Sequence, residues 1–330
     1  MCLINKPCPV AAHDVPDCSR VTRPAFASAP LKALYDIPAP AKLNLFLHVT
    51  GRRADGYHLL QSVFMLIDWC DTLHFELRTD GLISRTDLTA PGSPGVTGAE
   101  ALPGDDLTVR AARALQAASG TSLGVHISLE KRIPSQAGMG GGSSDAASCL
   151  LALQRLWGVR LPPEKLRALA LSLGADVPFF LSGGHAWVEG IGEKITPLPL
   201  PPARFIVVKP AAGVATQDIF SAPGLKRDAE TATMLGFAAY ANGQENLNFG
   251  PGFRSFKFGH NDLQPVAQEI CPQIKQSLDW LKLQQFEGRM TGSGSAVFAQ
   301  ILHDKDLAAA PGDWIIRKCR NLDRHPLAGW

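Results

Sequence analysis

The sequence predicts a two-domain α+β protein, and three observations support this prediction. The chain has 330 residues, about twice the ~150 residues of a common domain. A proline-rich segment at residues 197–202 is typical of a linker. On both sides of it, segments of alternating apolar and polar residues indicate strands, and apolar stripes at helical spacing indicate helices. We therefore expect domains over residues 37–197 and 203–330, after an irregular extension over residues 1–36.

The composition excludes several classes of protein. Lys and Arg number 32 against 30 Asp and Glu, so the net charge is +2, and 19% of residues are charged. This balance argues against a basic nucleic-acid binder and against a disordered chain. Although 45% of residues are hydrophobic, no apolar stretch reaches the ~18 to 20 residues that span a bilayer. We expect neither nucleic acid nor membrane as a partner, and the sequence does not predict an oligomeric state.

The first 36 residues lack the apolar core of a secretory signal. The seven cysteines are odd in number and scattered, unlike a disulfide framework. We therefore expect free thiols and a cytoplasmic protein.

The organised chain begins with a strand over residues 41–49. Alternation places Lys42 and Asn44 on one face, together with Phe46 and His48. The opposite face is aliphatic. For Lys42 the ordinary interpretation is a solvent-exposed side chain.

The remaining elements follow in order. The first domain is expected to contain extended segments at 59–68 and 72–77 separated by a turn at Asp71, a helix at 105–118, a strand at 125–130, and helices at 148–157 and 162–173. The second is expected to contain strands at 205–209, 296–301 and 314–318 and a largely helical segment at 263–283. Residues 222–260 are expected to be a surface excursion or a disordered insert.

The densest chemical signal is the glycine- and serine-rich segment 133–147, between the strand at 125–130 and a helix. Glycines let backbone N–H groups converge on a ligand, and a helix start attracts anions such as phosphate. The segment matches neither G-x-G-x-x-G nor the Walker pattern. The alternative is a flexible loop in which Ser143 or Ser144 caps the helix. The combination of glycines, serines and a helix start favours a phosphate site.

Asp176 lies among apolar residues, just beyond the helix that ends before Gly174. A carboxylate in such surroundings is paired, capping or catalytic, and from the residues alone an N-cap for a short turn competes evenly with a catalytic role. Together with Lys42 and the glycine loop, it would complete the parts that phosphoryl transfer needs. The carboxylate would orient or deprotonate the attacking hydroxyl, while the lysine stabilises negative charge.

These residues resemble the GHMP small-molecule kinases, whose central motif is a proline followed by a glycine- and serine-rich loop that opens a helix. The resemblance runs from about residue 38 to residue 319. Five blocks, in the family's order, resemble the branch that phosphorylates the 2-hydroxyl of a methylerythritol joined to cytidine diphosphate in non-mevalonate isoprenoid synthesis: residues 40–47, 53–58, 137–147, 173–179 and 291–295.

The resemblance implies a fold, cofactors and a set of site residues. It implies an N-terminal domain like the second domain of ribosomal protein S5, a ferredoxin-like C-terminal domain, and ATP with Mg²⁺. The implied catalytic pair is Lys42 and Asp176. The implied ATP-binding residues are Pro134, Ser135, Gln136, Ala137, Gly138, Met139, Gly140, Gly141, Gly142, Ser143 and Ser144. The implied residues for the small-molecule cytidine-diphosphate substrate are Asn44, Tyr57, His58, Thr216 and Phe220. Ser144 is the expected Mg²⁺ contact, with Ser143 or water as alternatives.

Some features leave alternatives open. From the residues alone, Tyr57 and His58 are expected to belong to an ordinary turn. Residues 291–295 are likewise expected to form a turn, although in the family they would close the cleft. Asp106 stands where the family commonly has asparagine near adenine, and Met139 where leucine is frequent. The alternative functions are another GHMP kinase, acting on homoserine, mevalonate or a sugar, and a catalytically silent ligand-binding relative.

Overall fold

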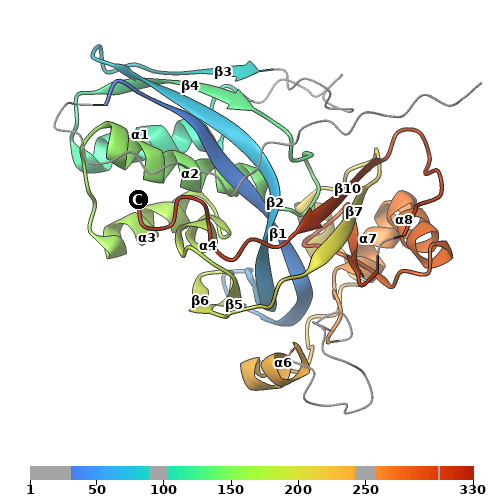
Figure 1. Ribbon diagram of the computed structural model, residues 1–330. Coiled ribbons are helices and arrows are strands. Elements are labelled where there is room, and N and C mark those ends of the chain that lie inside the picture. The colour runs from blue at the N-terminus through green and yellow to red at the C-terminus, as the bar shows by residue number, and fades with distance from the viewer. Residues whose placement is uncertain (1–30, 89–102, 242–257, 304) are drawn as a thin grey trace, which may run out of the picture.

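The computed structural model describes residues 31–88, 103–241, 258–303 and 305–330. The first layer contains six strands and four helices: β1 (Ala33–Arg52), β2 (His58–Arg78), β3 (Ile83–Leu88), α1 (Leu107–Ser119), β4 (Gly124–Glu130), α2 (Gly141–Leu156), α3 (Pro163–Leu173), α4 (Val177–Leu181), β5 (Ala186–Gly190) and β6 (Lys194–Pro197). The strand order is β3-β4-β2-β5-β6, with β1 also paired to β2. Helices α1–α4 gather on one side of this sheet (Figure 1).

A second, four-stranded sheet follows. Its elements are β7 (Arg204–Lys209), α5 (Thr216–Ser221), α6 (Met234–Ala241), α7 (Gln264–Ile270), α8 (Pro272–Leu283), β8 (Gly288–Met290), β9 (Val297–Ile301) and β10 (Ile315–Arg320). All its pairs are antiparallel, in the order β10-β7-β9-β8. Numbered along the chain this is 4-1-3-2, the order of a ferredoxin-like sheet. The described residues between β9 and β10 contain no helix, so the helical cover comes from α7 and α8. The predicted α+β class is confirmed.

Strands β1 and β2 are longer than predicted. β1 begins at Ala33, ahead of the expected start of the organised chain. The turn expected at Asp71 is wrong, because Asp71 lies inside β2 opposite Ala39. Its carboxylate is satisfied there by backbone N–H groups of residues 132 and 133, so the strand tolerates a buried acid.

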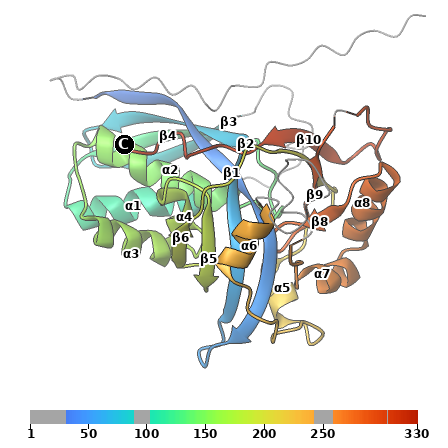
Figure 2. The same ribbon diagram turned by 60° about the horizontal axis from the view of Figure 1, so that its bottom comes forward.

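Both faces of β1 and β2 are buried in their central parts, at residues 37–49 and 61–67. Phe64 and Leu66 belong to the core shared with α1–α4, whereas Leu43 and Leu45 belong to a second core with Phe205 and other residues of the four-stranded sheet. Figure 2 shows the helices and the second sheet on opposite sides of these strands. The long strands therefore join the two layers, and polar groups in their central parts are buried rather than at the surface.

The segment predicted to be largely helical at 263–283 is helical, and it consists of two helices. α7 ends at Ile270, and α8 starts at Pro272 with Cys271 as its N-cap. Proline disfavours helical backbone in the residue before it, and it lacks the N–H that would continue α7. The expected excursion at 222–260 contains α6, whose Phe237 packs against Phe46 and Trp187. Residues 242–257 lie outside the described residues.

After β10 the chain returns to the first layer. We call residues 321–330 the C-terminal strap. Leu322 N donates to Leu66 O at 3.0 Å, and His325 N donates to Gly183 O at 2.9 Å. Leu327 is fully buried in the core between the first sheet and its helices. The first layer is therefore completed by the last described residues.

The expectation of free thiols holds in part. Cys149, Cys271 and Cys319 are buried free thiols, whereas Cys70 is disulfide-bonded, which corrects the expectation for that residue. Burial raises the pKa of the Cys149 and Cys319 thiols. Within the described ranges, no helix has the length and apolar character needed to cross a membrane.

Candidate active site

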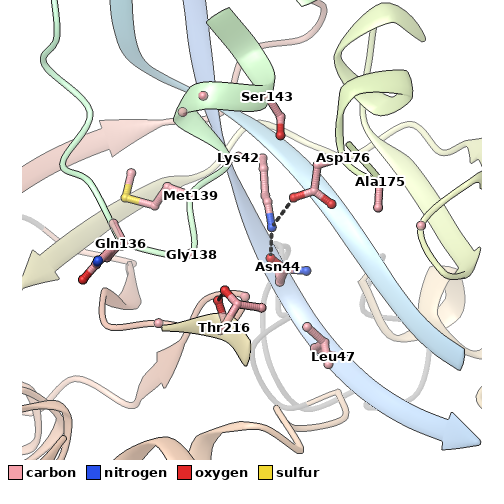
Figure 3. A pocket seen from close by; sticks show the side chains of 18 of the residues that line it. Lys42, Asn44, Leu47, Gln136, Gly138, Met139, Ser143, Ala175, Asp176 and Thr216 are labelled. Atoms are coloured by element: carbon pink, nitrogen blue, oxygen red, sulfur yellow. Dashed lines mark hydrogen bonds and ion pairs between the residues drawn. The ribbon is translucent and has the colours of Figure 1, made fainter. Parts of the chain in front are cut away.

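A cleft of about 1120 Å³ lies where the first layer meets the loops of the second. It gathers predicted residues from distant parts of the sequence, including Lys42, Tyr57, Asp176 and Thr216 and the loop from Pro134 onward. We call residues 133–145, together with the side chains that hold them in place, the phosphate end of the cleft. The acceptor end comprises Tyr57, His58, Thr216 and Phe220. Figure 3 shows the Lys42 side chain directed toward Asp176 and Asn44 among the residues that line the cleft.

The glycine loop leaves β4 and passes over β1. Lys42 N donates to Met139 O at 3.0 Å, which fixes the loop beside the predicted catalytic strand. Gly140 has φ of +71° and is the N-cap of α2. A Cβ at Gly140 would lie 3.0 Å from the Phe180 ring and 3.3 Å from Lys42 Cε. Only glycine both adopts this backbone conformation and leaves room for the lysine side chain.

A second loop, residues 291–295, interlocks with the glycine loop. A Cβ on Gly138, whose φ is +69°, would lie 2.2 Å from Thr291 O. Ser295 N donates to Gln136 O at 2.9 Å. Gly292, Ser293 and Gly294 also line the cleft. Residues 291–295 do form the turn of the hairpin between β8 and β9, but they also contact the phosphate end directly.

The start of α2 lies at the cleft. Gly141, Gly142 and Ser143 line it, and the first N–H groups of any helix lack partners within that helix. Ser144 does not line the cleft: it is fully buried, and its Oγ has no hydrogen-bond partner among the described residues. Neither serine caps the helix, since the N-cap is Gly140 without a side-chain bond. The arrangement suits an anion.

Lys42 and Asp176 form a pair at the centre of the cleft. Lys42 is 3% exposed, so the interpretation as a surface lysine is wrong. Its Nζ donates to Asn44 Oδ1 at 2.5 Å and lies 3.4 Å from Asp176 Oδ2. It also lies 4.5 Å from the centroid of the Phe64 ring. Ser62 Oγ accepts from Asn44 Nδ2 at 3.0 Å, so the amide that orients the lysine is itself held.

Asp176 is the N-cap residue of α4 by position, but its side chain makes no capping hydrogen bond. The carboxylate faces Lys42 instead, and 31% of the side chain is exposed. The Asp176 side chain therefore does not cap α4. A carboxylate that is partly solvated and lies beside a buried ammonium can accept a proton from a hydroxyl brought into the cleft.

A buried ionic cluster supports the phosphate end, and sequence reasoning missed it. Lys131 Nζ donates to Asp71 Oδ2, and to Asp145 Oδ2 at 2.7 Å. Asp71 Oδ1 accepts from the backbone N–H of Arg132 at 2.5 Å and of Ile133 at 2.8 Å. The cluster thus ties β2 to the start of the loop and to the first turns of α2.

The charges of this cluster are strongly coupled. Burial raises the pKa of Asp145 well above its usual range, against the opposing attraction of Lys131. Burial alone would lower the pKa of Lys131, but Asp145 and Asp71 outweigh it and the net shift is upward. One ammonium between two carboxylates therefore stays charged, because its neighbours supply excess negative charge. The two carboxylates lie 60 and 14 positions from Lys131 in the sequence, and no local sequence pattern identifies them.

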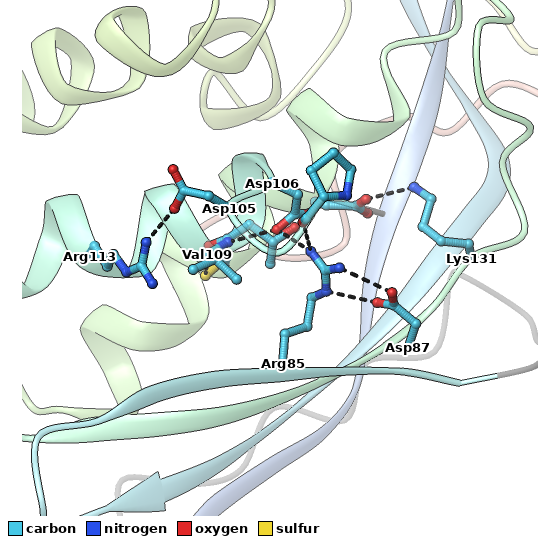
Figure 4. Close-up of polar contacts among 11 residues, drawn as sticks. Arg85, Asp87, Asp105, Asp106, Val109, Arg113 and Lys131 are labelled. Carbon is cyan, nitrogen blue, oxygen red and sulfur yellow. Dashed lines mark hydrogen bonds and ion pairs between the residues drawn. The ribbon is translucent and has the colours of Figure 1, made fainter. Parts of the chain in front are cut away.

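A second polar network lies at the outer rim of the phosphate end (Figure 4). Asp106 lines the cleft and caps α1 by accepting from Val109 N at 3.0 Å. Arg85 Nη1 lies 2.5 Å from Asp106 Oδ1, and Arg85 Nε lies 2.8 Å from Asp87 Oδ1. The carboxylate that replaces the family's common asparagine is therefore held by an arginine.

The acceptor end is built mostly from aromatic side chains. Tyr57 is 60% exposed, follows the turn that joins β1 to β2, and lines the cleft beside His58. The His58 and Phe220 ring centroids are 4.8 Å apart. Thr216 Oγ1 lies 2.7 Å from Ser293 Oγ, which connects α5 to the second glycine loop. The turn expected here exists, but its residues also face the cleft.

Arg227 was not predicted, although it contacts this end. Its Nε donates to His58 Nε2 at 3.0 Å. Burial, and then the charges of Arg227 and Arg52, lower the pKa of His58. The two residues are 169 positions apart, and no motif joins them.

No group of three or more His, Cys, Asp or Glu residues that could hold a metal ion occurs in the part of the chain that the structure describes.

Both layers of the chain are similar to known proteins. Residues 106–184 match the GHMP kinases N terminal domain, and residues 252–313 match the GHMP kinases C terminal domain. The chain is 78% identical to a 4-diphosphocytidyl-2-C-methyl-D-erythritol kinase of Polaromonas naphthalenivorans, over 94% of this chain and 100% of the relative. A relative of the same name from Albidiferax ferrireducens is 62% identical over 91% of this chain and 96% of its own length.

Solved structures agree as well. A crystal structure of a 4-(cytidine 5'-diphospho)-2C-methyl-D-erythritol kinase has a TM-score of 0.60 at 33% identity, covering 86% of this chain and 98% of that chain. A homoserine kinase from Cytophaga hutchinsonii has the same TM-score at 16% identity, over 92% of this chain and 98% of its own, and shows a shared fold alone. The predicted two-domain GHMP kinase fold is confirmed.

Proposed function

Because the chain belongs to the 4-diphosphocytidyl-2-C-methyl-D-erythritol kinases of the GHMP kinase family, it is an ATP-dependent small-molecule kinase, and we propose how its own residues carry out the transfer. The reaction phosphorylates the 2-hydroxyl of 4-diphosphocytidyl-2-C-methyl-D-erythritol and releases ADP. The product is the 2-phosphate, which places the step in isoprenoid precursor synthesis. The observation that carries the proposal is the Lys42–Asp176 pair at the junction of the phosphate end and the acceptor end.

In this proposal Asp176 is the general base. The 2-hydroxyl oxygen attacks the γ-phosphorus, its proton passes to Asp176, and the bond from the γ-phosphorus to the β,γ-bridging oxygen breaks with ADP as the leaving group. Lys42 lies 3.4 Å from the carboxylate, so its ammonium is placed to hold the attacking oxygen and to stabilise charge on the transferred group. Asn44 orients that ammonium.

The phosphate end would bind ATP. Residues 134–143 line the cleft, and their backbone N–H groups, with the start of α2, can surround the β- and γ-phosphates. A negative charge at the start of α2 would oppose this binding, but Lys131 neutralises Asp145 there. The acceptor end would bind cytosine, with Tyr57 and Phe220 offering ring faces and His58 a polar edge. Thr216 and Asn44 would lie nearer the methylerythritol.

Mg²⁺ would enter with the nucleotide. When bound, it would offset the negative charge of the phosphate groups. The residues present fit this mode, because Ser143 lines the cleft as a neutral oxygen ligand. The expected Ser144 contact has weaker support, since its Oγ is buried away from the cleft, although that atom lacks a partner among the described residues. Use of ATP also supports a cytoplasmic location.

The test is ADP release with Mg²⁺-ATP and four acceptors: the cytidyl substrate, homoserine, mevalonate and galactose. We expect turnover of the cytidyl substrate alone, with a monoester signal for the 2-phosphate in the ³¹P NMR spectrum. Asp176→Asn should lower kcat about 100- to 10,000-fold, as loss of a general base does. Asp279→Asn, in an exposed ion pair on α8, is the matched control. Turnover of another acceptor, or unchanged kcat in Asp176→Asn, would contradict the proposal.

A further inference from the structure

Arg227 has an unusual set of contacts at the acceptor end. Besides His58 Nε2, its guanidinium donates to three backbone carbonyl oxygens: Leu225 at 2.8 Å, Ala222 at 2.9 Å and Phe220 at 3.1 Å. The carbonyl contacts hold the end of α5, which carries Phe220, and the chain that follows it. One side chain therefore fixes both the histidine and the aromatic residue that face each other across this end of the cleft.

The contact with His58 determines where the imidazole carries its proton. A guanidinium has only donors and stays charged in proteins, so His58 Nε2 must accept. A neutral imidazole that accepts at Nε2 carries its hydrogen on Nδ1. Burial and the nearby positive charges lower the pKa of His58, which keeps the ring neutral. Nδ1 makes no hydrogen bond with any residue that the structure describes and is left as a donor for a ligand.

A donor at this position would distinguish the two common pyrimidines. Cytosine presents acceptors at O2 and N3, whereas uracil presents a donor at N3. An Nδ1–H group therefore complements cytosine at N3 and meets an N–H of uracil there. The opposite tautomer, with an unprotonated Nδ1, would reverse this preference. Unmatched polar groups in a binding site are costly, so the position of one proton can set base preference.

We propose that Arg227 is a positioning residue that sets the base specificity of the acceptor end, by holding His58 as an Nδ1–H donor beside the Phe220 ring. This inference rests on the proposed function, because it concerns recognition of the cytosine of that substrate. It assigns no chemical step to Arg227, which acts through the imidazole that it contacts.

The test compares Arg227→Met, Arg227→Lys and the unchanged protein. Two-bond ¹H–¹⁵N spectra of histidine-labelled protein, with His58 assigned from a His58→Gln spectrum, report the tautomer. The ratio of kcat/KM for the cytidine and uridine forms of the substrate reports specificity. We expect the Nδ1–H tautomer in the unchanged protein. In Arg227→Met we expect its loss, together with a decrease of about tenfold in the cytidine-to-uridine ratio, the value of one net hydrogen bond. The kcat at saturating cytidyl substrate should change much less.

Two controls keep the outcome interpretable. Arg52→Met removes the other nearby positive charge, which contacts Gly56 O rather than the imidazole, and should leave the tautomer unchanged. Arg227→Lys keeps a charged donor without the three carbonyl contacts and should retain Nδ1–H, even if Arg227→Met fails to fold. An unchanged tautomer or an unchanged ratio in Arg227→Met would overturn the inference. Absence of any cytidyl turnover in the unchanged protein would instead contradict the proposed function, and the spectra would still test the role of Arg227.

Discussion

The phosphate end and the acceptor end of the cleft are held in different ways. At the phosphate end, buried charges and backbone hydrogen bonds join β1, β2, α2 and the loop at 291–295, and glycines let backbones approach closely. At the acceptor end, the exposed Tyr57 lies beside side chains that are ordered largely by Arg227. The transferred phosphate would thus meet a frame of buried charges and backbone, whereas the base would meet a few side chains held through Arg227, with the exposed Tyr57 beside them. Substitutions at the two ends should consequently differ in what they change.

The largest effect is expected at the buried cluster. Lys131→Met leaves Asp71 and Asp145 without their shared counter-ion and should lower the free energy of unfolding by about 3 to 5 kcal/mol. Urea denaturation measures this change. Lys275→Met, in an exposed ion pair with Asp279 on α8, is the control and should change it by about 1 kcal/mol or less. Equal effects of the two substitutions would show that the phosphate end is not held by its buried charges.

At the junction of the two ends, Lys42→Met should lower kcat by about 100- to 1000-fold, the usual cost of removing a group that stabilises transition-state charge. The KM of the cytidyl substrate should change much less, because Tyr57 and His58, which would bind the cytosine, do not contact Lys42. Steady-state kinetics separate these two constants. A large rise in KM with unchanged kcat would place Lys42 in ground-state binding instead.

Gly138→Ala tests the interlock of the two loops. Its Cβ would lie 2.2 Å from Thr291 O at a φ of +69°, so the loops must separate at a cost of about 1 to 3 kcal/mol. We expect a KM for ATP at least about fivefold higher. Gly312→Ala introduces a Cβ that meets nothing within 4 Å and is the matched control. An unchanged KM for ATP in Gly138→Ala would mean that the loops are not rigid.

The smallest effect is expected from Tyr57→Ala. Loss of one stacking face should weaken binding of the cytidyl substrate by about 1 kcal/mol, the low end for stacking, because the ring is already largely solvated. The KM should rise about fivefold while the melting temperature stays constant. Tyr35→Ala, an equally exposed tyrosine on β1 outside the cleft, should change neither KM nor kcat. A fall in melting temperature with Tyr57→Ala would remove the contrast between the two ends.

The same contrast explains what the sequence could predict. The glycine loop and the start of α2 follow from local chemistry, since glycine and serine determine the backbone within a few residues. Alternation placed Lys42 and Asn44 on one face of a strand, but it could not show that the second sheet covers that strand. Asp71 was misread as a turn because its stabilising N–H partners lie about sixty residues away.

Contacts between distant segments account for the other differences. The Arg227–His58 contact and the C-terminal strap join segments that carry no shared local pattern. The roles of Tyr57 and His58 could be inferred only from the family resemblance, because their local sequence indicates nothing more than a turn. The glycine loop is a continuous run of residues, whereas the acceptor end is assembled from separate segments.

The C-terminal strap has a consequence for how the chain matures during synthesis. The first layer is nearly all translated by β6, yet Leu327, fully buried in its core, is made after the whole second sheet. At ~5 to 20 residues per second, the ribosome adds that residue on the order of ten seconds later. Until then, the core between the first sheet and its helices lacks one of its fully buried side chains. The first layer therefore completes its core only after the second sheet has been synthesised.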